Sequence, residues 1–289
     1  MIDRRAFALG LGAAAASVSA RAGEAFPGLA ATCATLEKDN GGRLGVAMLD
    51  TRSARRFEYR GEERFPVTST FKLIAAAGVL ARADRGEAAL DRLVSYAQGD
   101  LVTYSPATKE YVDRGMTLAA ICEAAVTLSD NTAGNLQLRE LGGPEGFTSF
   151  CRSLGDRVTR LDRWETALNE ALPGDERDTT SPAAMLADIE KLALGDVLKP
   201  ASRERLIGWM KDCRTSADRM KARLPAGWVV GDKTGAGERG TMNDVGILWP
   251  PDGAPVVLTI YFTGSPKSTP ERAAVHAEVG RAIAAATRP

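Results

Sequence analysis

The sequence has very little histidine and no excess charge of either sign. His276 is the only histidine in 289 residues, which excludes a multi-histidine zinc site and leaves a Ser-His-Asp triad one candidate base. Lys and Arg total 37, as do Asp and Glu, so neither a nucleic-acid groove nor an anionic membrane is expected as the main partner. A nucleophile in this chain is therefore expected to use a lysine or a carboxylate as its base.

Cysteine is also scarce. The four cysteines are too widely spaced for a disulfide scaffold, although an exported chain could pair them in any of three ways. We expect buried free thiols, and without close cysteine or histidine pairs we expect no metal and no cofactor. The residues are Cys33, Cys122, Cys151 and Cys213.

The first 22 residues differ from the rest of the chain. Arg4 and Arg5 precede an apolar, alanine-rich run over 8–18, and small residues up to Ala22 suit a signal peptidase. The run is too short to span a bilayer. We predict an export signal over 1–22 and a periplasmic mature protein. The paired arginines resemble a twin-arginine signal, and the general secretory route stays open.

Strand-like segments occur near both ends of the chain, and the middle is helical. Two strands are predicted over 43–49 and 56–59, after a helix over 25–36. Helical segments dominate 70–145, and three strands follow at 228–230, 245–249 and 256–262. A last helix is predicted after Ser268, with Pro270 at its first position. This order predicts a sheet domain built from both ends plus an all-α domain.

Three short motifs carry chemical side chains. Ser69 and Lys72 form the only S-x-x-K, at the start of an apolar helix, where a spacing of three puts both on one face. S-D-N follows at 129–131, and K-T-G stands at 233–235 at the end of a predicted strand. A serine that opens a helix is usually only an N-cap, and each tripeptide alone is a weak signal. All three motifs in this order are strong evidence that they act together in one functional site.

The combination resembles the serine penicillin-recognising enzymes, and a fourth element is similar to the omega loop of class A β-lactamases. That element is E-x-x-L-N, from Glu165 to Asn169, within a loop over 163–178. The resemblance covers the whole mature chain. It implies an α/β (α+β) fold with an antiparallel sheet of about five strands and terminal helices over 23–62 and 213–289, and an all-α domain over 63–212. It also implies hydrolysis of the β-lactam ring through a serine acyl-enzyme, and hence antibiotic resistance.

The resemblance assigns a role in acylation to four residues. Ser69 is the nucleophile, Lys72 exchanges a proton with it, and Ser129 relays a proton to the lactam nitrogen. The backbone N–H groups of Ser69 and Ala236 form the oxyanion hole. Whether Lys72, or Glu165 acting through water, takes the serine proton stays open.

Hydrolysis of the acyl-enzyme is assigned to the omega loop. By the resemblance, Glu165 and Asn169 hold the hydrolytic water, although an isolated loop glutamate is usually only a solvated carboxylate. Arg163 and Asp178 match the family's pair that ties the ends of the loop together, which suits a partly buried ion pair.

The resemblance also implies the substrate contacts. Asn131 orients Lys72 and the amide side chain of the substrate. Lys233 and Thr234 attract the substrate carboxylate, and Tyr104 forms an aromatic wall beside it.

The chain departs from the family pattern at two positions near the site. Met242 stands where the family often places an arginine, and Arg219 matches the position from which some members supply that charge instead. Arg214 and Arg223 are nearby alternatives. Thr166 follows Glu165 where some members have proline, so a cis peptide there would need structural support.

Other residues are given no catalytic role. We expect His276 at the surface or an interface, and Trp164, Trp228 and Trp249 as packing groups.

Two other classes of function remain as alternatives: a β-lactam sensor that is acylated without turnover, and a D,D-peptidase. Glu165 with Asn169 argues against both, because neither needs a positioned hydrolytic water. A β-lactam as the only small-molecule partner and a monomeric state are expected.

Overall fold

The computed structural model describes residues 26–251 and 253–287. The predicted export signal over 1–22 lies outside the described residues. Within the described part, no helix has the length and apolar character needed to cross a membrane.

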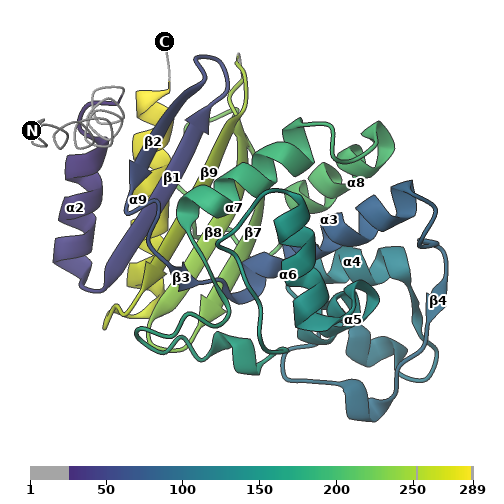
Figure 1. The fold of residues 1–289 in the computed structure, drawn as a ribbon. Helices are drawn as coiled ribbons and strands as arrows, with labels where there is room; N and C mark the ends of the chain where they lie inside the picture. The colour runs from purple at the N-terminus through teal and green to yellow at the C-terminus, as the bar shows by residue number, and fades with distance from the viewer. Residues whose placement is uncertain (1–25, 252, 288–289) are drawn as a thin grey trace, which may run out of the picture.

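Five antiparallel strands form the central sheet (Figure 1). From the N-terminal part come β1, Arg43–Asp50, and β2, Arg55–Tyr59. From the C-terminal part come β7, Val229–Gly237, β8, Thr241–Trp249, and β9, Val256–Thr263. The order β2-β1-β9-β8-β7 places β9 beside β1, so the last strand joins the two parts of the chain. The predicted α+β fold, with about five antiparallel strands, is confirmed.

The two faces of the sheet pack against different helices. In β1, Val46 and Met48 point to one face and Ala47 to the other, because side chains alternate along a strand. The first face is covered by the terminal helices α2, Leu29–Asn40, and α9, Thr269–Ala286 (Figure 1).

Helices from the middle of the chain cover the second face. Helix α7, Pro182–Ile189, lies on β1 and β9, and α8, Pro200–Lys211, lies against β7. Helix α3, Phe71–Asp84, runs through the centre of this helical part and is buried from Phe71 to Ala81. One hydrophobic cluster joins these helices to the sheet, so the boundary of an all-α domain at 63–212 stays a prediction. Around α3 lie α4, Leu118–Thr127, α5, Asn131–Leu141, and α6, Gly143–Ser153.

Short elements complete the described chain. The pair of β3 with β6 matters for the site, because it joins the segment before Ser69 to the segment after the omega loop. These elements are β3, Phe65–Pro66, β4, Leu93–Val94, β5, Met116–Thr117, β6, Thr179–Thr180, the 3-10 turns η1, Thr68–Thr70, η2, Gln98–Asp100, η3, Thr108–Tyr111, and η4, Ala167–Asn169, and the π-helical turn η5, Glu190–Leu194.

Helix α9 corrects two predictions. It begins at Thr269, so Pro270 takes the second helical position rather than the first. His276, expected at the surface or an interface, is fully buried, and burial lowers its pKa to about 3. It lies three residues after Ala273 and four before Gly280, on the buried face of the helix. His276 is therefore a neutral packing residue.

All four cysteines are among the described residues and are buried free thiols, as predicted. Burial raises the pKa of both Cys33 and Cys122 to about 12. Such thiols stay protonated and chemically inert at neutral pH.

Two buried carboxyl groups meet between α6 and α7. Asp156 Oδ1 accepts hydrogen bonds from the backbone N–H groups of Val158, at 2.6 Å, and Thr159, at 3.0 Å. A carboxyl oxygen of Asp156, a carboxyl oxygen of Asp188 and the Cys151 thiol lie within 4.8 Å of one another. Burial raises the pKa of Asp188 to about 9, and the charge of Asp156 adds to the shift. Asp188 is therefore the protonated partner of the pair at neutral pH.

We expect Asp188 to make folding less favourable as the pH rises. Its carboxyl keeps a proton up to about pH 9 in the folded protein, against an ordinary value of 3.8 in the unfolded chain. Between these values the unfolded state binds fewer protons, so stability falls with increasing pH. Asp188→Asn keeps the shape and an N–H donor toward Asp156. The substitution should therefore make folding stability depend less on pH in this window, and it should raise Tm by a few degrees in mildly alkaline buffer.

Thermal unfolding of both proteins across this pH window checks the prediction. Parallel profiles for wild type and Asp188→Asn would show that Asp188 is ionised in the folded protein.

Candidate active site

The S-x-x-K residues lie in a tight turn and the helix that continues it. Ser69 is the middle residue of η1, which runs directly into α3, and Lys72 follows in the first turn of that helix. Lys72 Nζ lies 2.8 Å from Ser69 Oγ. The predicted contact between the two side chains is therefore present, and it lies inside the protein, since both residues are buried.

Lys72 is surrounded by oxygen atoms. Besides Ser69 Oγ, its Nζ lies 2.5 Å from Asn131 Oδ1, 3.1 Å from the Ser129 carbonyl oxygen and 2.8 Å from Glu165 Oε1. An ammonium has three N–H donors, so these four acceptors compete for them. Desolvation lowers the pKa of Lys72, and the Glu165 carboxylate opposes this shift. Lys72 Nζ is therefore in direct contact with the two groups with which it could exchange a proton, the Ser69 hydroxyl and the Glu165 carboxylate.

The S-D-N motif is positioned by its central residue. Asp130 Oδ1 accepts the Ala133 backbone N–H at 2.8 Å, which caps α5, and Asp130 Oδ2 accepts the backbone N–H groups of residues 107 and 108. With Asp130 fixed, Ser129 Oγ points toward Lys233 and Asn131 Oδ1 points toward Lys72.

The K-T-G lysine is fully buried. Lys233 Nζ donates to Ser129 Oγ at 2.9 Å and to the Thr234 carbonyl at 2.7 Å, and it has no carboxylate partner among residues 26–251 and 253–287. Burial lowers its pKa to about 7, and repulsion from Lys72 adds to the effect. A bound carboxylate would supply the missing negative charge and favour the ammonium form.

The omega loop brings Glu165 to the nucleophile. Its Oε1 lies 3.3 Å from Ser69 Oγ, and its Oε2 accepts from Asn169 Nδ2 at 2.5 Å. Asn169 Oδ1 is buried and has no hydrogen-bond partner in the described part of the chain. The peptide between Glu165 and Thr166 is cis although Thr166 is not proline.

The two ends of the omega loop are held together by an ion pair. Arg163 Nε lies 2.6 Å from Asp178 Oδ2, and the two side chains are 18% and 1% exposed. Asp178 Oδ1 also accepts the backbone N–H groups of Asp162 and Arg163. The prediction of a partly buried pair at this position is confirmed.

A cavity of about 260 Å³ opens above these buried groups. Ser69, Ser129 and Thr234 form part of its wall, and Lys72, Glu165 and Lys233 lie beneath it. Tyr104 stands at the rim with 56% of its surface exposed. The other lining residues are Asn131, Asn169, Thr215, Arg219, Gly235 and Ala236.

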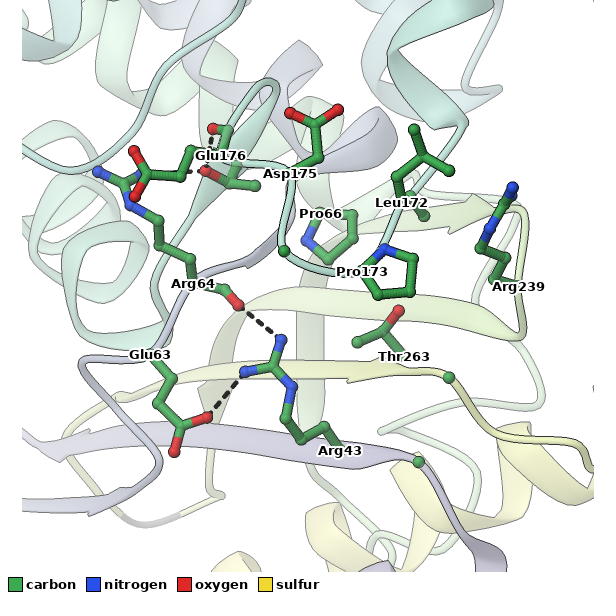
Figure 2. Close-up of a pocket in the computed structure, with 15 residues that line it drawn as sticks. Arg43, Glu63, Arg64, Pro66, Leu172, Pro173, Asp175, Glu176, Arg239 and Thr263 are labelled. Atoms are coloured by element: carbon green, nitrogen blue, oxygen red, sulfur yellow. Dashed lines mark hydrogen bonds and ion pairs between the residues drawn. The ribbon is translucent and has the colours of Figure 1, made fainter.

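A larger cavity, of about 640 Å³, lies between the omega loop and one end of the sheet. Figure 2 shows Leu172 and Pro173 on one side of it and Thr263 on another, with Arg43 paired to Glu63 below. None of the predicted site residues lines this cavity. The smaller cavity is the better candidate because the nucleophile, the two buried lysines and the carboxylate converge there.

Arg219 reaches the site from the segment before β7. Its Nη1 donates to the Gly235 carbonyl at 2.8 Å and to the Asn243 carbonyl at 2.6 Å, and the residue lines the smaller cavity. Met242 is buried in β8, opposite Ala236. Of the two alternatives, Arg214 is exposed and Arg223 pairs with Glu278 at 3.1 Å, so neither lines the cavity.

Sequence reasoning missed two residues of the site. Asn135 Oδ1 accepts the Glu165 N–H at 2.9 Å and its Nδ2 donates to the Glu165 carbonyl at 3.1 Å, so one amide fixes the backbone of the loop glutamate. It follows Asn131 by one helical turn, a spacing that could have identified it. Thr215 hydrogen-bonds Thr234 and lines the cavity.

Trp164 corrects another prediction. It was expected to be a packing residue, but 41% of its surface is exposed, whereas Trp228 and Trp249 pack against the two core clusters. The omega loop turns Glu165 inward, and its neighbour Trp164 consequently faces outward.

Comparison with known proteins identifies relatives along most of the chain. The model of the "Beta-lactamase enzyme family" matches residues 28–287. Beta-lactamase AST-1 of Nocardia asteroides is 48% identical over 250 residues, which are 86% of this chain and 81% of that protein. Beta-lactamase OXY-2 of Klebsiella oxytoca is 46% identical over 248 residues, 86% of each chain.

Solved structures agree with the sequence relatives. An ancestral class A β-lactamase superposes with a TM-score of 0.87 and 58% identity, over 88% of this chain and 98% of that one. The putative class A β-lactamase PenP of Rhodopseudomonas palustris gives a TM-score of 0.88 and 57% identity, over 89% and 99% of the two chains. The chain therefore belongs to the β-lactamase enzyme family and, within it, to class A.

Proposed function

We propose that this β-lactamase opens the β-lactam ring through an acyl-enzyme on Ser69, which water then hydrolyses, and that it thereby confers resistance to β-lactam antibiotics. The supporting observation is that one serine hydroxyl contacts both Lys72 Nζ, at 2.8 Å, and the Glu165 carboxylate, at 3.3 Å. Steady turnover of a chromogenic β-lactam by the purified protein tests the proposal.

In the acylation step, Ser69 Oγ attacks the lactam carbonyl carbon and gives up its proton. Both proposed bases lie within direct hydrogen-bond reach of Ser69 Oγ: Lys72 Nζ at 2.8 Å and Glu165 Oε1 at 3.3 Å. The backbone N–H groups of Ser69 and Ala236 hold the developing oxyanion, and loss of one such donor typically costs about 3–4 kcal/mol.

Ring opening breaks the carbon–nitrogen bond, and the nitrogen must receive a proton. Ser129 is the proposed relay: it gives its hydroxyl proton to the nitrogen, and the proton that Ser69 released returns to it through the neighbouring lysines, since its Oγ accepts from Lys233 and its backbone carbonyl accepts from Lys72. Lys233, Thr234 and Arg219 attract the substrate carboxylate, Asn131 faces its amide side chain, and Tyr104 closes the rim of the cavity.

In the deacylation step, Glu165 takes a proton from a water that attacks the ester carbonyl carbon. Ser69 Oγ leaves and recovers a proton, which completes the cycle. Asn169 donates to one Glu165 oxygen, and its own buried Oδ1 has lone pairs free to accept from the same water. This pair of side chains argues against a sensor that is acylated without turnover and against a D,D-peptidase.

We expect Arg219→Ala to weaken the use of substrates that carry the carboxylate. The lost charge-assisted contact is worth about 1.5–3 kcal/mol, or roughly ten- to a hundredfold in kcat/KM. Met242→Arg in the Arg219→Ala background should restore much of this loss, because β8 directs position 242 to the neighbourhood that Arg219 leaves. Steady-state kinetics with a penicillin measure both effects.

The alternatives in the sequence provide the controls. Arg214→Ala and Arg223→Ala should leave kcat/KM near the wild-type value, since both side chains lie away from the cavity. If Arg219→Ala also keeps wild-type kcat/KM, then Lys233, Thr234 and Ser129 suffice to hold the carboxylate.

The cellular site of action is also part of the proposal. Export directed by residues 1–22, with cleavage after Ala22, would place the mature enzyme in the periplasm, between incoming antibiotics and their cell-wall targets. The proposed active species is a monomer.

A further inference from the structure

Asn243 connects two parts of the active site that are far apart in sequence. It lies on β8 and is fully buried. Its side-chain Nδ2 donates to the Pro66 carbonyl at 2.9 Å and to Thr68 Oγ1 at 2.8 Å, in the segment that leads to Ser69. Its backbone carbonyl accepts from Arg219 at 2.6 Å.

The nucleophile turn packs against the K-T-G strand beside this amide. Gly235 pairs with Asn243 in the sheet, and a Cβ at Gly235 would lie 2.0 Å from Thr68 Oγ1. Only a glycine therefore allows η1 to come this close to β7. The Asn243 side chain, on the same face as its sheet partner, bonds the turn from the neighbouring strand.

Thr68 has a backbone conformation that needs external support. Its φ is +46°, which is unfavourable for a β-branched residue, and it is fully buried. Such conformations persist when surrounding contacts hold them in place. The bond from Asn243 to Thr68 Oγ1 is one of these contacts, and Ser69 is the next residue.

The Asn243 side chain also lowers the stability of the fold in one respect. Its Oδ1 is buried and has no hydrogen-bond partner among the described residues. A buried polar atom without a partner costs free energy, so the two donor contacts must compensate for it. An apolar side chain could fill the space without that cost but could not hold the turn.

We propose that Asn243 is a positioning residue for the oxyanion hole. The two N–H donors assigned to that hole belong to Ser69, on the turn, and Ala236, which follows Gly235 on β7. Their separation depends on how η1 sits against β7, and the Asn243 amide holds η1 in that place. This inference rests on the proposed acyl-enzyme mechanism.

The test measures the bond order of the acyl carbonyl in an accumulated acyl-enzyme. In a Glu165→Ala background, the infrared stretch of a ¹³C-labelled ester carbonyl reports how strongly the oxyanion hole polarises it. Adding Asn243→Ala should move this band to higher wavenumber. In the otherwise wild-type enzyme, Asn243→Ala should lower kcat/KM about tenfold, less than the 10²–10³-fold typical of losing a donor outright.

A buried threonine on the adjacent strand provides the matched control. Thr259 Oγ1 donates to the Pro182 carbonyl at 2.9 Å, away from the cavity, so Thr259→Ala should lower Tm without moving the band or kcat/KM. Thr68→Val removes the oxygen that Asn243 contacts while keeping the side-chain volume. Thr68→Val should reproduce the band shift. If Asn243→Ala does not fold, the experiment is done with Thr68→Val instead.

The possible results separate this inference from the proposed function. If the parent Glu165→Ala protein forms an acyl-enzyme but its band is the same with Asn243→Ala or Thr68→Val, the positioning role is wrong. If labelled substrate attaches to Ser69 neither in the parent nor in the wild-type protein, the acyl-enzyme mechanism is wrong, and this inference is then wrong as well.

Discussion

Ser69→Ala is expected to lower kcat for β-lactam hydrolysis by roughly 10⁴–10⁶-fold, the range reported by removal of a serine nucleophile. The physical reason is that no other hydroxyl replaces its contacts with Lys72 Nζ and the Glu165 carboxylate. The one histidine cannot activate a different serine there, because His276 is fully buried on α9, where its Nδ1 contacts the Arg272 backbone carbonyl. Turnover of a chromogenic substrate measures the loss.

A second buried serine serves as the matched control. Ser265 is 4% exposed and donates to the Asn40 carbonyl at 2.8 Å, so Ser265→Ala removes a comparable hydroxyl away from the cavity. Its kcat should stay near that of the wild type. Mass spectrometry of the wild-type protein with a slow substrate should place the adduct on Ser69, and an adduct on any other serine contradicts the assignment.

Contacts set by helical geometry could be predicted from sequence. Ser69 and Lys72 meet because residues three apart lie on one face of a helix. Runs of apolar and β-branched residues likewise made β1, β8 and β9 recognisable, since these strands are buried along most of their length. The Arg163–Asp178 pair is different, because its 15-residue separation defines no geometry of its own and only the family resemblance predicted it.

Contacts that depend on packing between distant segments could not be predicted. Asn135 clamps the Glu165 backbone across 30 residues, and Asn243 reaches Thr68 across 175 residues. Neither contact follows from the period of a helix or a strand, because the two residues of each pair are too far apart in the sequence. His276 was misplaced for a related reason, since a polar residue on an alanine-rich helix does not reveal which face the sheet covers. Such positions become visible only once the layers of the fold are assembled.

Glu165→Ala is expected to separate the two half-reactions. Deacylation should slow by about 10²–10⁴-fold, the usual contribution of a general base. Acylation should slow less, because Lys72 keeps its contact with Ser69 Oγ and remains bonded to Asn131 and the Ser129 carbonyl. The acyl-enzyme should therefore accumulate, and intact-protein mass spectrometry after mixing with a penicillin should show a persistent adduct.

Another glutamate of the omega loop provides the control for this variant. Glu176 is exposed, and the contact it makes with Thr179 uses its backbone carbonyl, so Glu176→Ala keeps that bond and should turn over normally. If Glu165→Ala turned over at the wild-type rate, the hydrolytic water would have to be activated elsewhere. If it formed no adduct and lost all turnover, Glu165 would be needed for acylation, and Lys72 alone could not be the base. A persistent adduct with near-normal acylation instead assigns the serine proton to Lys72, because the lysine is then the one remaining base within hydrogen-bond distance of Ser69 Oγ among the described residues.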